Sequence, residues 1–196
     1  MPSRSFLLSP ASLNGTRAKQ LMSPRAEFEA ARLFRSQQGV PIGLAFAFMS
    51  ALYFRGKIAY ASHFATPSPA IGGSGVYVIT PGFGLVEPEW TIDQERMKVM
   101  RRVPVDAKSR SYRKPLERDA KGLAGALGSD AEVVLLGSVA TGKYVDVLWP
   151  IFGERLRFPA VFAGLGDMSR GGLMLRAVRE NRELEYTTLD APRRRK

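Results

Sequence analysis

An acid, a hydroxyl and a guanidinium lie close together in the glycine-rich segment 164–172 of this chain. The acid is Asp167, and Ser169 and Arg170 come two and three residues after it, with Arg176 further along the same helix-like segment. A carboxylate can stabilise developing positive charge or orient a water molecule, whereas serine and arginine suit a phosphate at the start of a helix. The sequence therefore predicts Asp167 as a catalytic residue and the other three as phosphate ligands. The alternative for Asp167 is a purely structural role as a helix N-cap.

Two further loops, 9–17 and 81–89, carry residue types that recognise nucleobases. The carboxamide of Asn14 offers a donor and an acceptor to a base edge, although an asparagine before a glycine also suits a plain turn. Phe83 lies between two glycines, so it can stack on an unstacked base or simply cover the core. We predict that Asn14 acts beside Asp167 in the catalytic site. The predicted base pocket consists of Ser9, Tyr53 and Phe83.

The segment 137–143 nearly matches the phosphate-binding pattern GxxxxGK[ST] and follows a strand-like run. Tyr144 stands where the pattern requires the Ser or Thr whose hydroxyl binds magnesium. A strand-to-helix turn without any ligand is the alternative interpretation. We nevertheless predict two phosphate ligands here and nearby: Lys143, and Arg17 in the loop 9–17.

The chain is strongly basic, with 29 Lys and Arg against 18 Asp and Glu and a formal net charge of +11. Such a charge attracts polyanions, with nucleic acid first and anionic membranes second, so we predict DNA as the partner. The basic run 96–118 suits phosphate contacts, but it is also compatible with an ordinary solvated face. The chain has no cysteine and one histidine, which excludes disulfides, thiolate zinc sites and multi-histidine metal sites. We therefore expect neither a metal nor a cofactor.

The apolar segment 40–54 is shorter than the roughly 20 residues that span a bilayer, so it predicts a buried helix. The apolar run after Arg4 is too short for a secretory signal. We expect a monomeric, cytoplasmic protein that does not bind membranes.

The three loops need a scaffold that brings them together. Strand-like and helical segments alternate along the chain, which predicts an α/β three-layer sandwich with a mostly parallel central sheet of about four strands. The strands are expected at 5–9, 76–80, 132–136 and 158–162, with a short terminal edge strand at 184–188 and a helical region at 43–64. Parallel strands present their carboxyl ends at one edge, so the loops should form one pocket there. We predict a single α/β domain, 1–190, and a basic disordered tail, 191–196.

The loop set, the strand order and the basic charge together resemble the uracil-DNA glycosylase-like superfamily. The loop 9–17 takes the place of that family's first motif, and Phe83 takes the place of its base-stacking aromatic. Ser169 matches the serine of its His-Pro-Ser core, whereas Asp167 and Met168 stand where the family has His and Pro. The first loop also lacks the family's Gly-Gln-Asp-Pro or Gly-Glu-Ala-Pro pattern.

This resemblance implies a uracil-DNA glycosylase-like fold and a DNA glycosylase that needs no cofactor. Such an enzyme flips a base out of the DNA stack, cleaves its N-glycosidic bond and leaves an abasic site. The departures from the motifs favour a modified base, such as a hypermodified cytosine of phage DNA, with a role in defence or repair. Two other functions are compatible with the same residues: a non-catalytic nucleic-acid-binding module and a P-loop-like nucleotide-binding protein.

Overall fold

A six-stranded sheet forms the centre of the computed structural model, which describes residues 2–188. Its strand order is β4-β3-β1-β6-β7-β8. The four inner strands are parallel, namely β1 (Arg4–Leu8), β3 (Val76–Thr80), β6 (Glu132–Leu136) and β7 (Leu156–Pro159). The α/β class and the mostly parallel sheet are confirmed, but the predicted number of about four strands was wrong. The predicted domain end at 190 and the tail 191–196 lie outside the described residues.

The outer strands are antiparallel edges, β4 (Gly84–Val86) and β8 (Tyr186–Thr187), and β8 confirms the terminal edge strand predicted within 184–188. The segment of β4 was predicted as a loop because of its glycines and prolines. Gly82 and Gly84 instead adopt positive φ angles of 86° and 80°, which lets the chain reverse tightly and pair with β3. The Thr80 hydroxyl donates a hydrogen bond of 2.9 Å to the Gly84 carbonyl oxygen and closes this hairpin.

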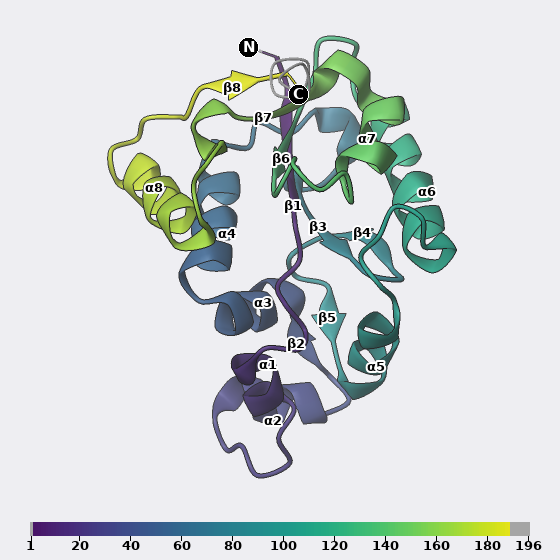
Figure 1. Cartoon of the computed structure of the whole chain (residues 1–196), viewed down its shortest axis with the longest axis vertical. Helices are drawn as coiled ribbons and strands as arrows, with labels where there is room; N and C mark the ends of the chain where they lie inside the picture. Colours follow the sequence, from purple (N-terminus) through teal and green to yellow (C-terminus); the bar gives the residue numbers. More distant parts are fainter. Residues whose placement is uncertain (1, 189–196) are drawn as a thin grey trace.

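Helices cover both faces of the sheet, giving three layers (Figure 1). Along β1, Phe6 and Leu8 pack into the core on one face and Leu7 into the core on the other, as expected of a strand buried on both sides. The first core includes residues of α1 (Thr16–Leu21), α2 (Glu29–Arg35), α3 (Ile42–Ser50), α4 (Leu52–Phe64), α5 (Gln94–Arg102) and α8 (Asp167–Arg179). The second includes residues of α6 (Arg110–Ala126) and α7 (Val145–Phe152).

Short elements complete the fold. A separate antiparallel pair consists of β2 (Val40–Pro41) and β5 (Thr91–Ile92). Single 3-10 turns are present at η1 (Pro69–Ile71), η2 (Gly153–Arg155) and η3 (Ala160–Phe162).

The predicted helical region 43–64 is two helices, because the chain breaks at Ala51. This residue has φ 47° and ψ −118°, a conformation that non-glycine residues rarely adopt. The break leaves α3 with 9 residues and α4 with 13. Within residues 2–188, no helix combines the length and the apolar character that crossing a membrane requires.

At the edge where the parallel strands end, the sheet has a topological switch point between β1 and β6, since the chain leaves these neighbouring strands toward opposite faces. β1 runs from the N-terminus toward α1, as Figure 1 shows, and its neighbours in the sheet are β3 and β6. The helices that follow β1 contribute to one core, whereas α7, which follows β6, contributes to the other. Because the loops after β1 and β6 diverge to opposite faces, a crevice opens between them, which is where α/β sheets bind ligands.

The helices α4 and α8 touch backbone to backbone at two glycines. A Cβ atom built on Gly56 would lie 2.7 Å from the Gly171 carbonyl oxygen, and one built on Gly171 would lie 2.8 Å from the Leu52 carbonyl oxygen. Neither position therefore accepts even a methyl group without the helices moving apart. This contact fixes the N-terminal half of α8 beside the N-terminal half of α4.

We predict that Gly171→Ala lowers the free energy of unfolding by about 1–3 kcal/mol, because the methyl group forces the two backbones apart. The matched control is Gly172→Ala on the same helix, where a new Cβ meets no atom within 4 Å. That control should leave stability unchanged or raise it by up to about 1 kcal/mol through helix propensity. Urea unfolding followed by circular dichroism measures both, and equal effects of the two substitutions would contradict the close packing.

Candidate functional site

Two adjoining cavities occupy the switch point at the carboxyl edge of the sheet. The outer cavity measures about 430 Å³ and the inner cavity about 190 Å³. Five residues line both of them: Pro10, Ser12, Lys143, Tyr144 and Asp167. The two cavities are therefore direct neighbours, and we call them together the cleft.

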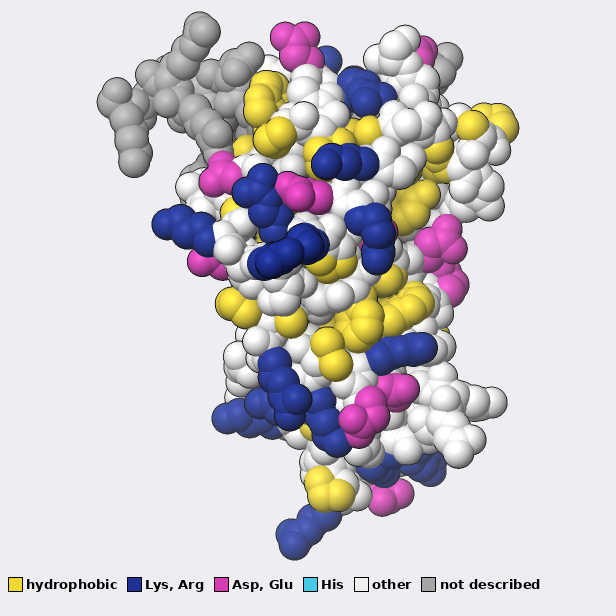
Figure 2. Space-filling model, turned by 90° about the vertical axis from the view of Figure 1, so that its right-hand side faces the viewer, with side chains coloured by type: hydrophobic (Ala, Val, Ile, Leu, Met, Phe, Trp, Pro, Cys, Tyr) yellow, Lys and Arg dark blue, Asp and Glu magenta, His cyan; other side chains and the backbone are white. Residues whose placement is uncertain are grey.

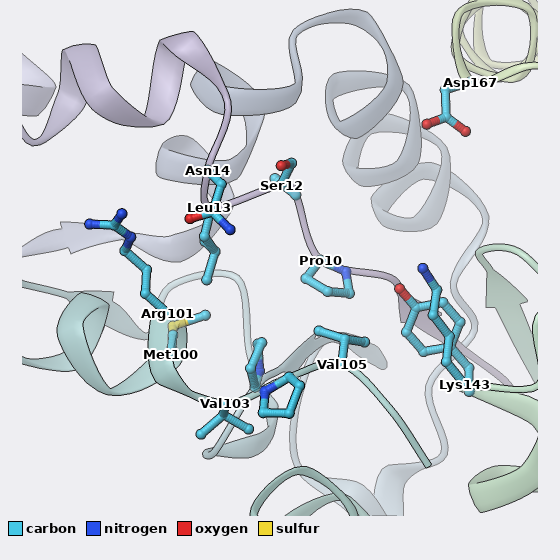
Figure 3. A pocket seen from close by; sticks show the side chains of 14 residues that line it. Pro10, Ser12, Leu13, Asn14, Met100, Arg101, Val103, Val105, Lys143 and Asp167 are labelled. Atoms are coloured by element: carbon cyan, nitrogen blue, oxygen red, sulfur yellow. The ribbon is translucent and has the colours of Figure 1, made fainter. Parts of the chain in front are cut away.

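The outer cavity has polar groups at both ends. Figure 3 shows Asn14 and Arg101 at one end and Lys143 and Asp167 at the other, with Ser12 between them. Asn14 and Ser12 come from the loop after β1, whereas Arg101 is the penultimate residue of α5. The predicted loops 9–17 and 164–172 thus meet across this space, and the basic run 96–118 contributes a guanidinium to it.

The inner cavity lies deeper, against the end of β1. Its lining adds Ser9, Met49, Ser50, Tyr53, Ser138 and Arg170. Ser9 extends the β1–β6 ladder by one residue, because its backbone N–H and its hydroxyl both donate to the Leu136 carbonyl oxygen at 3.2 Å. Gly137 makes room for this serine, since a Cβ there would lie 2.9 Å from the Ser9 Cβ.

Asp167 begins α8 but does not cap it. Gly166 is the N-cap residue, and no side chain there accepts a hydrogen bond, so the predicted N-cap alternative for Asp167 is wrong. The Asp167 side chain is 70% exposed, and its carboxylate lies 3.9 Å from the Arg170 guanidinium. Its charge is thus available to a ligand in the cleft, and the helix dipole stabilises it.

Arg170 is held in place by the turn that precedes α8. Its Nε and Nη2 atoms donate to the Phe162 carbonyl oxygen at 3.2 and 2.9 Å, and its guanidinium lies 5.5 Å from the centre of the Phe162 ring. Because its side chain is only 15% exposed, its positive charge is fixed in the wall of the cleft rather than dissolved in water.

Lys143 reaches the cleft from the loop after β6. Its ammonium lies 5.2 Å from the centre of the Tyr144 ring, and Tyr144 itself is buried. α7 begins only at Val145, so the near-P-loop segment 137–143 forms the strand-to-helix turn of the alternative interpretation. Within that turn, Lys143 still faces a space large enough for a ligand.

The group that the sequence interpretation missed is Lys57, the largest charged side chain in the core. It is 1% exposed, and its ammonium donates to the Ser9 carbonyl oxygen at 2.7 Å and to the Ser9 hydroxyl at 2.9 Å. The spacing of residues in the sequence could have indicated its burial. With 3.6 residues per helical turn, Lys57 lies on the same face of α4 as Tyr53, Phe54 and Tyr60, all of which are buried. A lysine among those aromatics is buried rather than solvated.

Burial changes the acid–base chemistry around the inner cavity. Desolvation lowers the pKa of Lys57 to about 7; the Asp167 carboxylate opposes this shift, and the Arg170 and Lys143 cations add to it. Desolvation also raises the pKa of Tyr144, although its contact with Ser9 acts in the other direction. The Tyr53 hydroxyl is buried with no hydrogen-bond partner of good geometry within residues 2–188; burial raises its pKa, and the nearby Arg170 guanidinium opposes the rise.

Six of the predicted site residues line the cleft, namely Ser9, Asn14, Tyr53, Lys143, Asp167 and Arg170. Four do not: Arg17, Phe83, Ser169 and Arg176. Phe83 packs against Trp90 with ring centres 5.2 Å apart, which agrees with its core-covering alternative. Arg17 donates to the Phe48 carbonyl oxygen at 3.3 Å, whereas Ser169 and Arg176 are exposed on α8.

Comparisons with known proteins find no match to a family model, to a curated protein or to a solved structure. The resemblance to the uracil-DNA glycosylase-like superfamily thus stays a prediction from the sequence. Residues 2–188 also contain no group of three or more His, Cys, Asp or Glu side chains placed to hold a metal ion.

We predict that Lys57 makes the stability of the protein depend on pH. In the unfolded chain the lysine keeps its proton up to its ordinary pKa of 10.5, whereas in the fold it loses the proton near pH 7. Between these values the unfolded state binds more protons, so folding gains stability as pH rises and loses it as pH falls through about 7. Compared with Lys57→Met, the wild type should thus gain free energy of unfolding from pH 7 toward pH 10.

Chemical unfolding at a series of pH values measures this difference. Lys121→Met is the control, because Lys121 is an exposed lysine on α6, and its difference from the wild type should stay flat over the same range. A flat difference for Lys57→Met as well would show that the buried amine does not lose its proton on folding.

Proposed function

We propose that the protein is a DNA glycosylase that binds a flipped nucleotide in the cleft and hydrolyses its N-glycosidic bond. The observation that carries this proposal is the arrangement at the switch point. A solvated carboxylate, Asp167, faces a space that is otherwise lined by the cations Lys143, Arg170 and Arg101.

The charges suit the two halves of such a substrate. A nucleotide brings negative charge on its phosphate, which lysine and arginine side chains bind at the open ends of the cleft. Cleavage of the N-glycosidic bond develops positive charge on the sugar, and a carboxylate nearby stabilises it. In this proposal Lys143 and Arg101, at opposite ends of the outer cavity, bind the two phosphates that flank the flipped nucleoside, Asp167 faces the sugar, and Asn14 reads the base edge.

A basic surface leads to the cleft and supports a polymeric substrate. Figure 2 shows several Lys and Arg side chains on the face that carries α5 and α6, with Asp, Glu and hydrophobic side chains among them. A groove of about 710 Å³ on this part of the molecule is lined by Arg110, Lys114 and Arg118, and it begins at Gly82. A Cβ on Gly82 would lie 3.3 Å from Val103, which lines the outer cavity, so the groove and the cleft are neighbours. A DNA backbone along α6 could therefore deliver a flipped nucleotide into the cleft.

The first test measures base release. Purified protein is incubated with single- and double-stranded DNA that carries normal, uracil or hypermodified cytosine bases, and released bases are identified by mass spectrometry. We expect release from at least one modified DNA and alkali-labile abasic sites in the product. Asp167→Asn should slow release by about 100-fold or more, because it removes the charge that stabilises the transition state. DNA affinity should change little, since Asp167 does not bind phosphate in this proposal.

The matched control for that substitution is Asp130→Asn. Asp130 is an exposed carboxylate that comes just before β6, at the opposite edge of the sheet, and it should retain full activity. If the wild type binds DNA but releases no base from any substrate, the glycosylase proposal is wrong and the protein is a nucleic-acid-binding module.

The second test measures how binding depends on salt. We expect the slope of log affinity against log salt to shrink by about 1 for Arg101→Gln and again for Lys143→Gln, because each substitution removes one phosphate contact. Arg182→Gln is the control, since Arg182 follows the far end of α8 and lies outside both cavities. Fluorescence anisotropy of labelled DNA at several salt concentrations gives the slopes, and three equal slopes would place the phosphates elsewhere.

A further inference from the structure

The contact between Lys57 and Ser9 is a built arrangement rather than a chance approach. Both side chains are almost completely buried, at 1% and 5% exposure, and they come from α4 and from the end of β1. The Lys57 Nζ atom lies 2.7 Å from the Ser9 carbonyl oxygen and 2.9 Å from the Ser9 Oγ atom. Ser9 also lines the inner cavity, so the pair connects a buried amine to the cleft.

Among the residues that the structure describes, no carboxylate forms an ion pair with Lys57. Its Nζ atom lies 4.2 Å from the centre of the Tyr53 ring and 5.0 Å from that of Phe54. The charged groups that face it are Asp167 and Arg170 from α8 and Lys143 from the loop after β6, one anion against two cations. Burial together with these cations brings its pKa to about 7, so near neutral pH a large share of the molecules hold it as a free amine.

A free amine changes the direction of the hydrogen bond to Ser9. The ammonium form can only donate to the Ser9 hydroxyl, whose own proton then goes to the Leu136 carbonyl oxygen at 3.2 Å. The neutral form has a lone pair at 2.9 Å that can accept the hydroxyl proton in place of that carbonyl. A serine whose proton has an acceptor within hydrogen-bond distance is an activated oxygen, which is the arrangement of serine–lysine enzymes.

We propose that Ser9 and Lys57 form a proton-transfer pair, in which Ser9 is a catalytic residue at the wall of the cleft and Lys57 accepts a proton through it. For its natural substrate this inference rests on the proposed function. Asp167 is then left with the electrostatic role alone, because the pair supplies the base that activates water.

The hydrolysis consumes one water molecule and releases the base. The oxygen of a water molecule forms a bond to the C1′ carbon of the sugar while the bond from C1′ to the base nitrogen breaks, and the base leaves with that electron pair. The water gives one proton to the Ser9 Oγ atom, and the Ser9 hydroxyl proton passes to the Lys57 Nζ atom. The departing base takes a proton from solvent, and Lys57 later returns its proton to solvent through Ser9.

The experiment uses a probe that contains neither a base nor a sugar, so its result does not depend on the glycosylase proposal. Methanesulfonyl fluoride is a small electrophile: a sulfur–oxygen bond to Ser9 forms, the sulfur–fluorine bond breaks, fluoride leaves, and Lys57 takes the serine proton. Intact and peptide mass spectrometry of the full chain locates the adduct and gives its rate from pH 5.5 to 9. We expect a single adduct on Ser9, whose rate rises with pH around a midpoint near 7.

The variants separate proton transfer from mere structural support. Lys57→Met should slow labelling by about 100-fold or more and abolish its midpoint near pH 7, and Ser9→Ala should give no adduct at this peptide. Lys121→Met, an exposed lysine far from the cleft, should label at the wild-type rate. Circular dichroism checks that each variant is folded; if Lys57→Met is not, the wild-type pH profile and Ser9→Ala decide.

The outcomes distinguish the two proposals. Absence of a Ser9 adduct, a rate without a midpoint between pH 6 and 8, or equal labelling of a folded Lys57→Met variant overturns the proton-transfer pair. If Ser9 is labelled as expected but no base is released from any DNA, the proton-transfer pair is supported and the glycosylase proposal is wrong. If bases are released but Ser9 is not labelled, the glycosylase proposal is supported and the proton-transfer pair is wrong.

Discussion

The backbone contact between α4 and α8 is the constraint on which the rest of the site depends. Gly56 and Gly171 allow the two helices to approach more closely than any side chain permits. Lys57 follows the first glycine and Arg170 precedes the second, so the contact fixes both cations close to the end of β1. It also carries Asp167, the first residue of α8, to the mouth of the cleft. Two glycines, which have no side chain, thus determine where the charged side chains of Lys57, Asp167 and Arg170 lie.

The same contact creates an excess of positive charge that the protein does not balance internally. Arg170 and Lys143 both act on Lys57, whereas the carboxylate that acts on it within residues 2–188, that of Asp167, is mostly exposed to water. A solvated carboxylate compensates buried charge weakly, because water screens it. An anionic ligand in the cleft would supply the missing negative charge, which is why the arrangement favours a phosphate-bearing substrate over a neutral one.

The scaffold was predictable from the sequence because it depends on local patterns. Runs such as 76–80 and 132–136 are apolar on both faces and read as buried parallel strands, and the order of strands and loops then brings Ser9, Asn14 and Asp167 to one edge. The β4 hairpin escaped prediction because glycines at positive φ make a loop-like sequence pair as a strand. Lys57 was not predicted as a site residue because its partners come from distant parts of the chain: Ser9 follows β1, and α8, more than a hundred residues away, packs closely beside Gly56.

The charge around Lys57 also restricts where a phosphate can bind if Ser9 is to act. An anion bound at Arg170, beside the inner cavity, would offset the cations that keep Lys57 neutral and would raise the pKa of its amine. The amine would then hold its proton and could not accept another. An anion at Lys143 has a weaker effect, because Lys143 lowers the pKa of Lys57 less than Arg170 does. An anion at Arg101, at the far end of the outer cavity, adds binding energy with the least effect on Lys57, since the interaction falls with distance and with exposure to water. The geometry therefore favours phosphate in the outer cavity and leaves the inner cavity to the uncharged sugar and the attacking water.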